Sequence, residues 1–303
     1  MAINRTEIFK KVNKVIRKHF QPTLPNSRMP LLEQLVYAAC LENSNAEAAE
    51  QAYAALEEQF FDWNEIRVST VTELSEVIHM LTDPRAAAGR VKRSLQSVFE
   101  ANYSFELEAF KKENIGIAVK RIRSYRGAVT PFAVAYVTQN ALGGHAIPLG
   151  AGALNVLFII GAISEKEKSA HSVPGLERAI PKNKGPEFGS LINQLGVEFQ
   201  RTPFGPPVRK IILEIEPSAK DRLPKRQSKT VKPTRPVKKA KTALKKPKKG
   251  TKPKTVKKKI VVKKKKASTA PKKPASVKTK KRATVKKVKK KVATKRGAKR
   301  KPK

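Results

Sequence analysis

The charge of this chain is divided so unevenly that only its first part can fold around a core. Asp221 is the last acidic residue, and the 82 residues from Arg222 to Lys303 carry 39 Lys or Arg, no Asp or Glu and no aromatic side chain. A segment this charged and this poor in bulky apolar groups buries too little surface to offset the entropy lost on ordering. Residues 222–303 are therefore predicted to be a disordered polycationic tail.

The texture of the tail indicates its partner. Short lysine clusters alternate with Ala, Val, Thr and Pro, and eight prolines between Pro224 and Pro302 interrupt any continuous helix. Such a polycation gains free energy by releasing counterions condensed on DNA, whatever the base sequence. The tail resembles the basic arms of linker histones and of bacterial histone-like proteins. DNA is the expected partner and RNA an alternative, whereas a membrane is disfavoured because apolar anchors are absent.

Residues 1–221 have the composition of a folded domain. They carry 27 basic and 24 acidic residues, a net charge of +3, and hold all twelve Phe, all five Tyr and Trp63. This length suffices for one domain or two small lobes. The single cysteine, Cys40, excludes a disulfide framework and a four-cysteine iron–sulfur cluster, so no cofactor or metal is expected. No signal peptide or membrane-spanning run is recognised. We expect an intracellular protein, in the cytoplasm or nucleoid of a bacterium or the nucleus of a eukaryote.

The domain shows the apolar periodicity of consecutive helices. Apolar residues recur every fourth position from Ile8 to Phe20, and basic residues take the other side. No stretch alternates with period two, so the predicted fold class is all-α. Start signals for four further helices are Pro30, the pairs Ser44/Glu47 and Thr70/Glu73 with capping-box spacing, and Asp83 before Pro84.

The segment from Ile117 to Ile163 carries the most specific pattern. It predicts a basic helix, a tight turn at Gly127, a second helix opening at Thr130-Pro131, and an apolar helix after Gly150. Two helices joined by a glycine-bearing hairpin can aim backbone N–H groups and a helix N-terminus at a phosphate. The residues expected to contact DNA are Lys120, Arg121, Arg123, Arg126, Gly127, Ala128, Val129 and Thr130.

On these features, residues 5 to about 215 resemble the helix-hairpin-helix DNA glycosylases, a base-excision-repair superfamily that includes endonuclease III. The resemblance rests on the order of hairpin, apolar helix, glycine turn and Ile-Pro-Leu-Gly, and on a partial match of the segment from Tyr125 to Ala133 to the family hairpin Leu-Pro-Gly-Val-Gly. It implies two helical lobes with DNA bound across the cleft between them.

The catalytic groups that this resemblance implies are missing. Lyase-competent members attack the sugar with a lysine just after the hairpin, where this chain has Pro131 or Phe132. About eighteen residues later they place an Asp that stabilises positive charge on the sugar, where this chain has Gly150. The four cluster-binding cysteines have no counterpart. Possible substitutes are Glu165, Glu167 and His145, each of which is interpreted as a surface or hydrogen-bonding residue. Cys40 is interpreted as a buried apolar side chain.

Three functions are compatible with the sequence. The first is a catalytically degenerate DNA-binding protein, whose domain of residues 1–221 keeps the glycosylase scaffold and whose tail of residues 222–303 supplies histone-like affinity. The second is an active glycosylase or abasic-site lyase with a relocated catalytic group. The third is an RNA-associated or chromatin-compacting structural protein.

Overall fold

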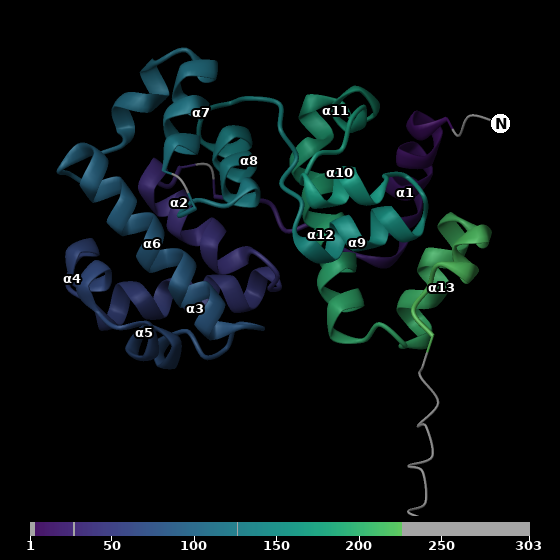
Figure 1. The fold of residues 1–303 in the computed structure, drawn as a ribbon, viewed down its shortest axis with the longest axis horizontal. Helices are drawn as coiled ribbons and strands as arrows, with labels where there is room; N and C mark the ends of the chain where they lie inside the picture. Colours follow the sequence, from purple (N-terminus) through teal and green to yellow (C-terminus); the bar gives the residue numbers. More distant parts are fainter. Residues whose placement is uncertain (1–3, 27, 126, 226–303) are drawn as a thin grey trace, which may run out of the picture. The chain divides into compact units, whose positions relative to one another are not determined.

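The computed structural model describes residues 4–26, 28–125 and 127–225, and every regular element in these ranges is helical, which confirms the all-α prediction (Figure 1). The predicted disorder of the tail concerns residues that lie outside these ranges, apart from its first four. The helices are α1 Arg5–His19, α2 Leu31–Leu41, α3 Ala46–Gln59, α4 Trp63–Val68, α5 Val71–Val77, α6 Pro84–Asn102, α7 Ile115–Ser124, α8 Pro131–Asn140, α9 Ala151–Ile159, α10 Glu165–Ser169, α11 Leu176–Ala179, α12 Gly185–Arg201 and α13 Pro206–Ile215, with 3-10 turns at Glu108–Lys112 (η1), Lys182–Lys184 (η2) and Pro217–Asp221 (η3).

The helices bury two separate hydrophobic cores. The first is built from residues between Leu31 and Val137, which are the residues of α2 to α8. The second combines α1 with residues between Ile147 and Leu223. Helix α1 therefore packs on α11, α12 and α13, far from it in sequence, and Figure 1 shows its purple ribbon beside these green helices. Two cores match the two lobes expected from the sequence.

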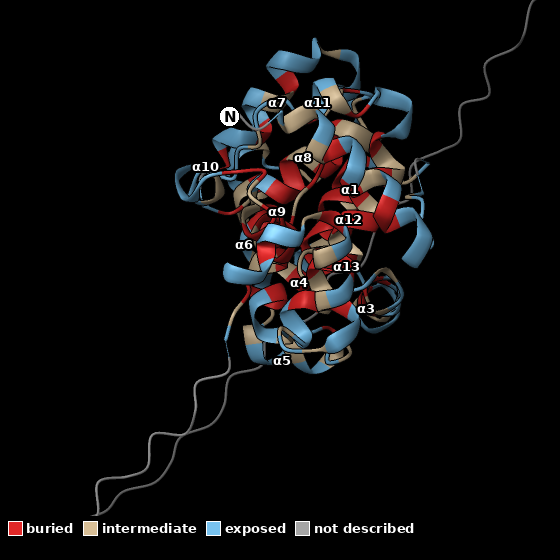
Figure 2. Cartoon of the chain, turned by 90° about the vertical axis from the view of Figure 1, so that its right-hand side faces the viewer, coloured by how far each residue is buried: buried red, intermediate tan, exposed pale blue. Residues whose placement is uncertain are grey.

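Helix α9 is the most completely apolar helix and crosses α12 without an intervening side chain. A Cβ atom added to Gly152 would overlap the carbonyl group of Gly196, and one added to Gly196 would overlap the backbone of Ala153. Only glycine lets the two backbones approach this closely. Figure 2 shows the buried (red) residues that run through α9 and α12 in the second core.

All the predicted helix start signals except Ser44/Glu47 lie at the start of a helix. Thr70 and Glu73 form the predicted capping box of α5, and Asp83 caps α6. The predicted box of Ser44 and Glu47 is wrong, because Asn45 caps α3 by accepting from the N–H of Ala48. Ser44 is buried and its hydroxyl oxygen accepts from the N–H of Thr82, so burial removes it from the helix terminus.

Two short helices lie between α3 and α6. Helix α5 ends at Val77, and Ile78 and Leu81, which follow it, are buried in the first core. The short helix α4, which is capped by Asp62, was not predicted. Six residues are too few to display an apolar period, so the capping aspartate was the available signal.

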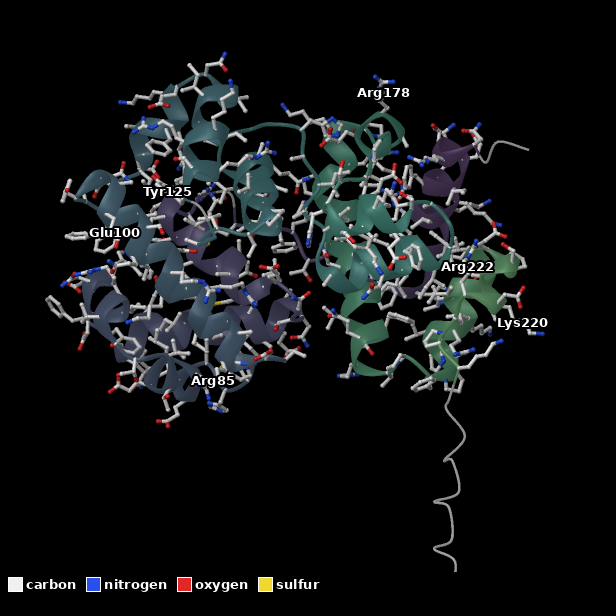
Figure 3. The ribbon with its side chains drawn as sticks, viewed as in Figure 1. Arg85, Glu100, Tyr125, Arg178, Lys220 and Arg222 are labelled. Atoms are coloured by element: carbon white, nitrogen blue, oxygen red, sulfur yellow. The ribbon has the colours of Figure 1, made fainter. Side chains whose placement is uncertain are left out.

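The folded body extends beyond the last acidic residue. Leu223 is buried in the second core, and the Arg222 Nε donates to the carbonyl oxygen of Ile159 at 2.6 Å (Figure 3 labels Arg222). The Arg209 guanidinium donates to the carbonyl oxygen of Pro224 at 3.0 Å. Residues 222–224, placed in the tail on charge alone, therefore pack on the body.

Candidate nucleic-acid interface

The predicted hairpin is a tight turn between α7 and α8. The N–H groups of Ala128 and Val129 both donate to the carbonyl oxygen of Tyr125, at 3.2 and 3.3 Å. Gly127 has a φ of +69°, which lies in the left-handed region that disfavours a side chain. Gly127 is also exposed, and no atom lies within 4 Å of the place its Cβ would take. The turn thus requires glycine for its backbone angle and presents an uncovered backbone to solvent.

Two hydrogen bonds fix this turn to α6. The Ser94 hydroxyl donates to the carbonyl oxygen of Ala128 at 3.2 Å, and the Asn102 amide donates to the hydroxyl of Tyr125 at 2.9 Å. Figure 3 shows Tyr125, labelled, at the end of α7. Both Tyr125 and Ala128 are buried, so the hairpin is anchored on its inner side while Gly127 faces out.

Helix α8 begins at the end of the hairpin, as predicted. The Thr130 hydroxyl oxygen accepts from the N–H of Ala133 at 3.2 Å, and Pro131 occupies the first helical position. A helix N-terminus carries a partial positive charge of about +0.5 that attracts anions. The exposed glycine and the start of α8 therefore stand next to each other, an arrangement suited to a phosphate.

The basic residues of α7 fall into two groups. The Arg121 guanidinium lies 4.1 Å from the Phe110 ring centre and forms an ion pair with Glu113. Lys120 and Arg123 are exposed and form no ion pair within residues 4–225 as described. The structure thus leaves two of the three predicted cations available for phosphate and engages the third. Arg126 lies outside the described residues.

The residues at the family's nucleophile position have no amine. Pro131 is exposed, and Phe132 is buried, with its ring 6.3 Å from that of Tyr136 in a stacked arrangement. Phe132, Tyr136 and Tyr37 line a small cavity of about 50 Å³. The described residues that line it include no Lys, Arg, Asp or Glu, so its walls are aromatic rings, prolines and neutral polar groups.

Gly150, at the family's carboxylate position, is enclosed by two amide side chains. Its N–H donates to Oδ1 of Asn193 at 2.8 Å, and the N–H of Ala151 donates to Oδ1 of Asn43 at 3.2 Å. A Cβ atom on residue 150 would lie 3.3 Å from both oxygens. The N–H groups at the start of α9 therefore donate to neutral amide oxygens, one from α12 and one from Asn43 between α2 and α3.

One carboxylate that the sequence did not single out does reach the hairpin. Oε2 of Glu42 accepts from the Thr130 hydroxyl at 2.8 Å and lies 3.4 Å from Nε of Arg90. The side chains of Glu42 and Arg90 are 12% and 11% exposed, so this is a largely buried ion pair. Glu42 ends α2, about 90 residues before the hairpin. Sequence spacing gives no signal for this contact.

Glu167, one possible substitute for the missing catalytic groups, is engaged in other contacts. Glu167 caps α10 and pairs with Arg5 at 2.8 Å, and the N–H of Ser164, with Arg5, lowers the pKa of its carboxyl to about 2. A carboxyl that stays ionised to such a pH cannot serve as a general acid near neutrality. Burial raises the pKa of the Cys40 thiol to about 12, as expected of an apolar core residue. Glu165 is exposed at the first turn of α10.

His145 faces a larger cavity beside the hairpin. This cavity, of about 760 Å³, is also lined by Arg123, Val129, Pro131, His171 and Glu177. The Nε2 atom of His145 is shielded from solvent and has no hydrogen-bond partner among the described residues. The hairpin, the start of α8 and Arg123 thus share one concave surface. Within the described ranges no cluster of three or more His, Cys, Asp or Glu could hold a metal ion, and no helix is long and apolar enough to cross a membrane.

Comparisons with known proteins give a match in structure only. No protein-family model and no curated protein sequence matches this chain. Solved structures that it resembles are those of DNA glycosylases. A thermostable thymine-DNA glycosylase aligns with a TM-score of 0.45 and 15% identity, over 63% of this chain and 85% of that one. An endonuclease III, trapped as a covalent intermediate with DNA, aligns with a TM-score of 0.47 and 14% identity, over 73% of this chain and 100% of that one.

An 8-oxoguanine glycosylase/lyase from Clostridium acetobutylicum, in complex with double-stranded DNA, aligns with a TM-score of 0.40 and 14% identity, over 62% of this chain and 68% of that one.

Proposed function

We propose that this chain is a DNA-binding protein on a helix-hairpin-helix glycosylase-like scaffold, with a basic tail that adds sequence-independent affinity. The observation that carries the proposal is the hairpin. An exposed Gly127 with left-handed φ precedes the N-terminus of α8, and the uncommitted cations Lys120 and Arg123 stand on the helix before it. An exposed turn, a helix dipole and free positive charge are features that favour binding of a DNA phosphate.

In this proposal the scaffold has lost lyase chemistry. A Schiff base needs an amine at the sugar, and the proline at position 131 cannot supply one. The amide oxygens of Asn43 and Asn193 occupy the surroundings of Gly150, where the family has a carboxylate. Neutral amide oxygens stabilise a developing positive charge less than an ionised carboxylate does. The proposed role is to hold DNA without breaking the glycosidic bond.

Binding and trapping assays test this function together. The full chain and residues 1–225 would be incubated with duplex DNA that contains an abasic site, with and without borohydride. We expect both proteins to bind and neither to form a covalent adduct. A borohydride-dependent adduct, or excision of any base from a panel of damaged duplexes, would overturn the degenerate role.

An active glycosylase is the second candidate, and Glu42 is the observation that favours it. Its carboxylate lies at Thr130, one residue before the family's nucleophile position. The pairing of Glu42 with Arg90 opposes this candidate, because the neighbouring guanidinium offsets the negative charge that would stabilise a sugar cation. Base excision is measured on the same panel of damaged duplexes. Excision by the wild type that is lost in Glu42→Gln would establish the second candidate in place of the first.

An RNA-associated or chromatin-compacting role is distinguished by the body alone. The tail binds any nucleic acid through counterion release, so only residues 1–225 can discriminate. We expect residues 1–225 to prefer duplex DNA over structured RNA of equal length. Equal affinity for both would mean that the body binds nucleic acid through charge alone and that the hairpin does not recognise DNA.

A further inference from the structure

Four consecutive residues between α2 and α3 hold together parts of both cores. Glu42 accepts from the Thr130 hydroxyl of the hairpin, and Asn43 accepts from the N–H of Ala151 at the start of α9. Ser44 accepts from the N–H of Thr82, and Asn45 caps α3. Asn43 adopts a φ of +64°, a left-handed conformation that asparagine tolerates better than most residues. We call residues 42–45 the α2–α3 connection.

We infer that Glu42 is a positioning residue for the hairpin, acting through Thr130. This inference rests on the proposed function for its consequence in DNA binding, but its geometric content stands on the contacts themselves. Glu42 does not belong to the exposed surface that would meet a phosphate. It lies behind the hairpin, where it sets the orientation of the hydroxyl that caps α8.

The hydroxyl of Thr130 has one proton and must use its oxygen as the cap. Its proton goes to Oε2 of Glu42 at 2.8 Å, which leaves the oxygen lone pairs to accept from the N–H of Ala133. A charged acceptor makes this bond stronger than a neutral one would. The side-chain rotamer of Thr130, and with it the first turn of α8, is therefore fixed by the carboxylate.

Glu42 is itself held rigidly. Nε of Arg90 donates to the carbonyl oxygen of Ala39, and a terminal nitrogen of Arg90 donates to the carbonyl oxygen of Glu42, each at 3.0 Å. The guanidinium thus binds carbonyl oxygens of the last turn of α2 and also lies beside the Glu42 carboxylate. These two bonds fix the guanidinium on the last turn of α2, which keeps its positive charge 3.4 Å from the Glu42 carboxylate.

The next residue couples this arrangement to the second core. Asn43 satisfies the N–H of Ala151 immediately after Glu42 satisfies Thr130, so one short connection sets where the starts of α8 and α9 lie relative to each other. The two helix N-termini at the candidate site are thereby held by adjacent side chains. Loosening Glu42 is expected to release the hairpin while Asn43 continues to cap α9.

The test uses the full chain with the variants Glu42→Ala, Glu42→Gln, Thr130→Val and the double variant Glu42→Ala/Thr130→Val. Affinity for duplex DNA is measured at a salt concentration where a synthetic peptide of residues 226–303 no longer binds. Glu47→Ala is the matched control, because Glu47 is an exposed carboxylate in the first turn of α3.

We expect Glu42→Ala and Thr130→Val each to weaken DNA binding about tenfold, the order of one lost charge-assisted hydrogen bond. The double variant should be no weaker than either single variant, since both remove the same bond. Glu42→Gln should retain most of the affinity because its amide oxygen still accepts from Thr130. Additive losses in the double variant, or a Glu42→Gln as weak as Glu42→Ala, would overturn the inference.

Amide hydrogen exchange separates this inference from the proposed function. In Glu42→Ala, amide exchange should become faster at residues 127–134 and should not change in α3 or α9. In the control Glu47→Ala, exchange at residues 127–134 should equal that of the wild type. Uniform acceleration across the first core would make Glu42 a general stabilising residue and contradict the inference. If the wild-type chain fails to bind DNA while exchange changes only at residues 127–134, the proposed function fails and the positioning role stands.

Discussion

The starts of α8 and α9 occupy the two positions that matter most in the resemblance to DNA glycosylases, and they differ in what they offer a ligand. Helix α8 begins after an exposed glycine, has uncommitted cations next to it and opens toward a large cavity. Helix α9 begins at a buried glycine whose surroundings are filled by the amides of Asn43 and Asn193. The start of α8 thus borders exposed residues and a cavity, whereas the start of α9 is buried between amide side chains.

Under the proposed function, this difference separates the part of the chain that would hold DNA from the positions that would carry chemistry. Holding DNA through the hairpin would need only backbone geometry and positive charge, which the exposed Gly127 and the cations of α7 provide. Excision needs an amine or a carboxylate at defined atoms, and the chain has Pro131 and Gly150 there. The proposal of a DNA-holding scaffold follows from this contrast.

The largest effect is expected where α9 crosses α12. Replacing Gly196 by Ala would force its methyl group into the backbone of Ala153, so we expect a loss of about 3 kcal/mol or more in the free energy of unfolding. Thermal and denaturant unfolding measure it. Gly116→Ala is the control, because its nearest contact would be a side-chain oxygen at 3.2 Å. Equal, small effects in both variants would show that the crossing tolerates separation and that the closed state of α9 does not depend on it.

The hairpin should respond next most strongly. Gly127→Val places a β-branched residue at a φ of +69°, which costs about 1–2 kcal/mol locally and distorts the exposed backbone. We expect the affinity of the body for duplex DNA to fall about tenfold or more, while the melting temperature falls by only a few degrees. Gly127→Asn is the matched control, since asparagine tolerates this conformation. Unchanged binding in Gly127→Val would remove the open terminus of α8 from DNA recognition.

The cations of α7 should separate into those that meet phosphate and the one that does not. Lys120→Ala and Arg123→Ala should each reduce the slope of log affinity against log salt by about 1, the contribution of one neutralised phosphate. Arg121→Ala should change the slope less, because Arg121 is engaged by Glu113 and the Phe110 ring. A salt titration of DNA binding by residues 1–225 compares the three. If Arg121→Ala had the largest effect, the separation read from the ion pairs would be wrong.

Much of this contrast was predictable from local sequence signals. The glycine turn, the Thr130-Pro131 start of α8 and the missing amine and carboxylate are properties of neighbouring residues, so they could be read directly. Contacts between distant residues could not. Glu42 reaches Thr130 across 88 positions, Glu108 caps α2 through Leu31 across 77, and nothing local announces either. Burial likewise decided that Asn45 rather than Ser44 caps α3.

The same reason explains the end of the body. Charge composition predicts a boundary at Asp221, because no acidic residue follows it. Composition does not indicate which later residues contact the folded body. Leu223 packs in the second core, and Arg222 binds the carbonyl oxygen of Ile159, 63 positions earlier. Residues 1–225 are therefore the better choice for isolating the body.

The smallest predicted effect concerns the stability of the start of α10, where Glu167 binds Ser164 and Arg5. The N–H of Ser164, with Arg5, lowers the pKa of Glu167 from its usual 4.5 to about 2. A depressed carboxyl pKa contributes stability above the unfolded pKa and loses it as pH falls. The small stability difference between wild type and Glu167→Gln should therefore be present at pH 7 and vanish between about pH 4.5 and pH 2.

Thermal unfolding across this pH range measures the difference, with Glu165→Gln as the control at an exposed position of the same turn. A difference that persists unchanged at pH 2 would mean that the carboxylate charge is not what stabilises the start of α10.

The most direct test is the binding of residues 1–225 to a duplex that contains an abasic site, measured against heparin of equal charge as competitor. If the open terminus of α8 recognises DNA, the body should bind the duplex in the presence of heparin, lose most of that affinity in Gly127→Val, and leave the DNA uncut. A body that heparin displaces as readily as it displaces the synthetic tail peptide, with Gly127→Val behaving as wild type, would contradict DNA recognition by this fold.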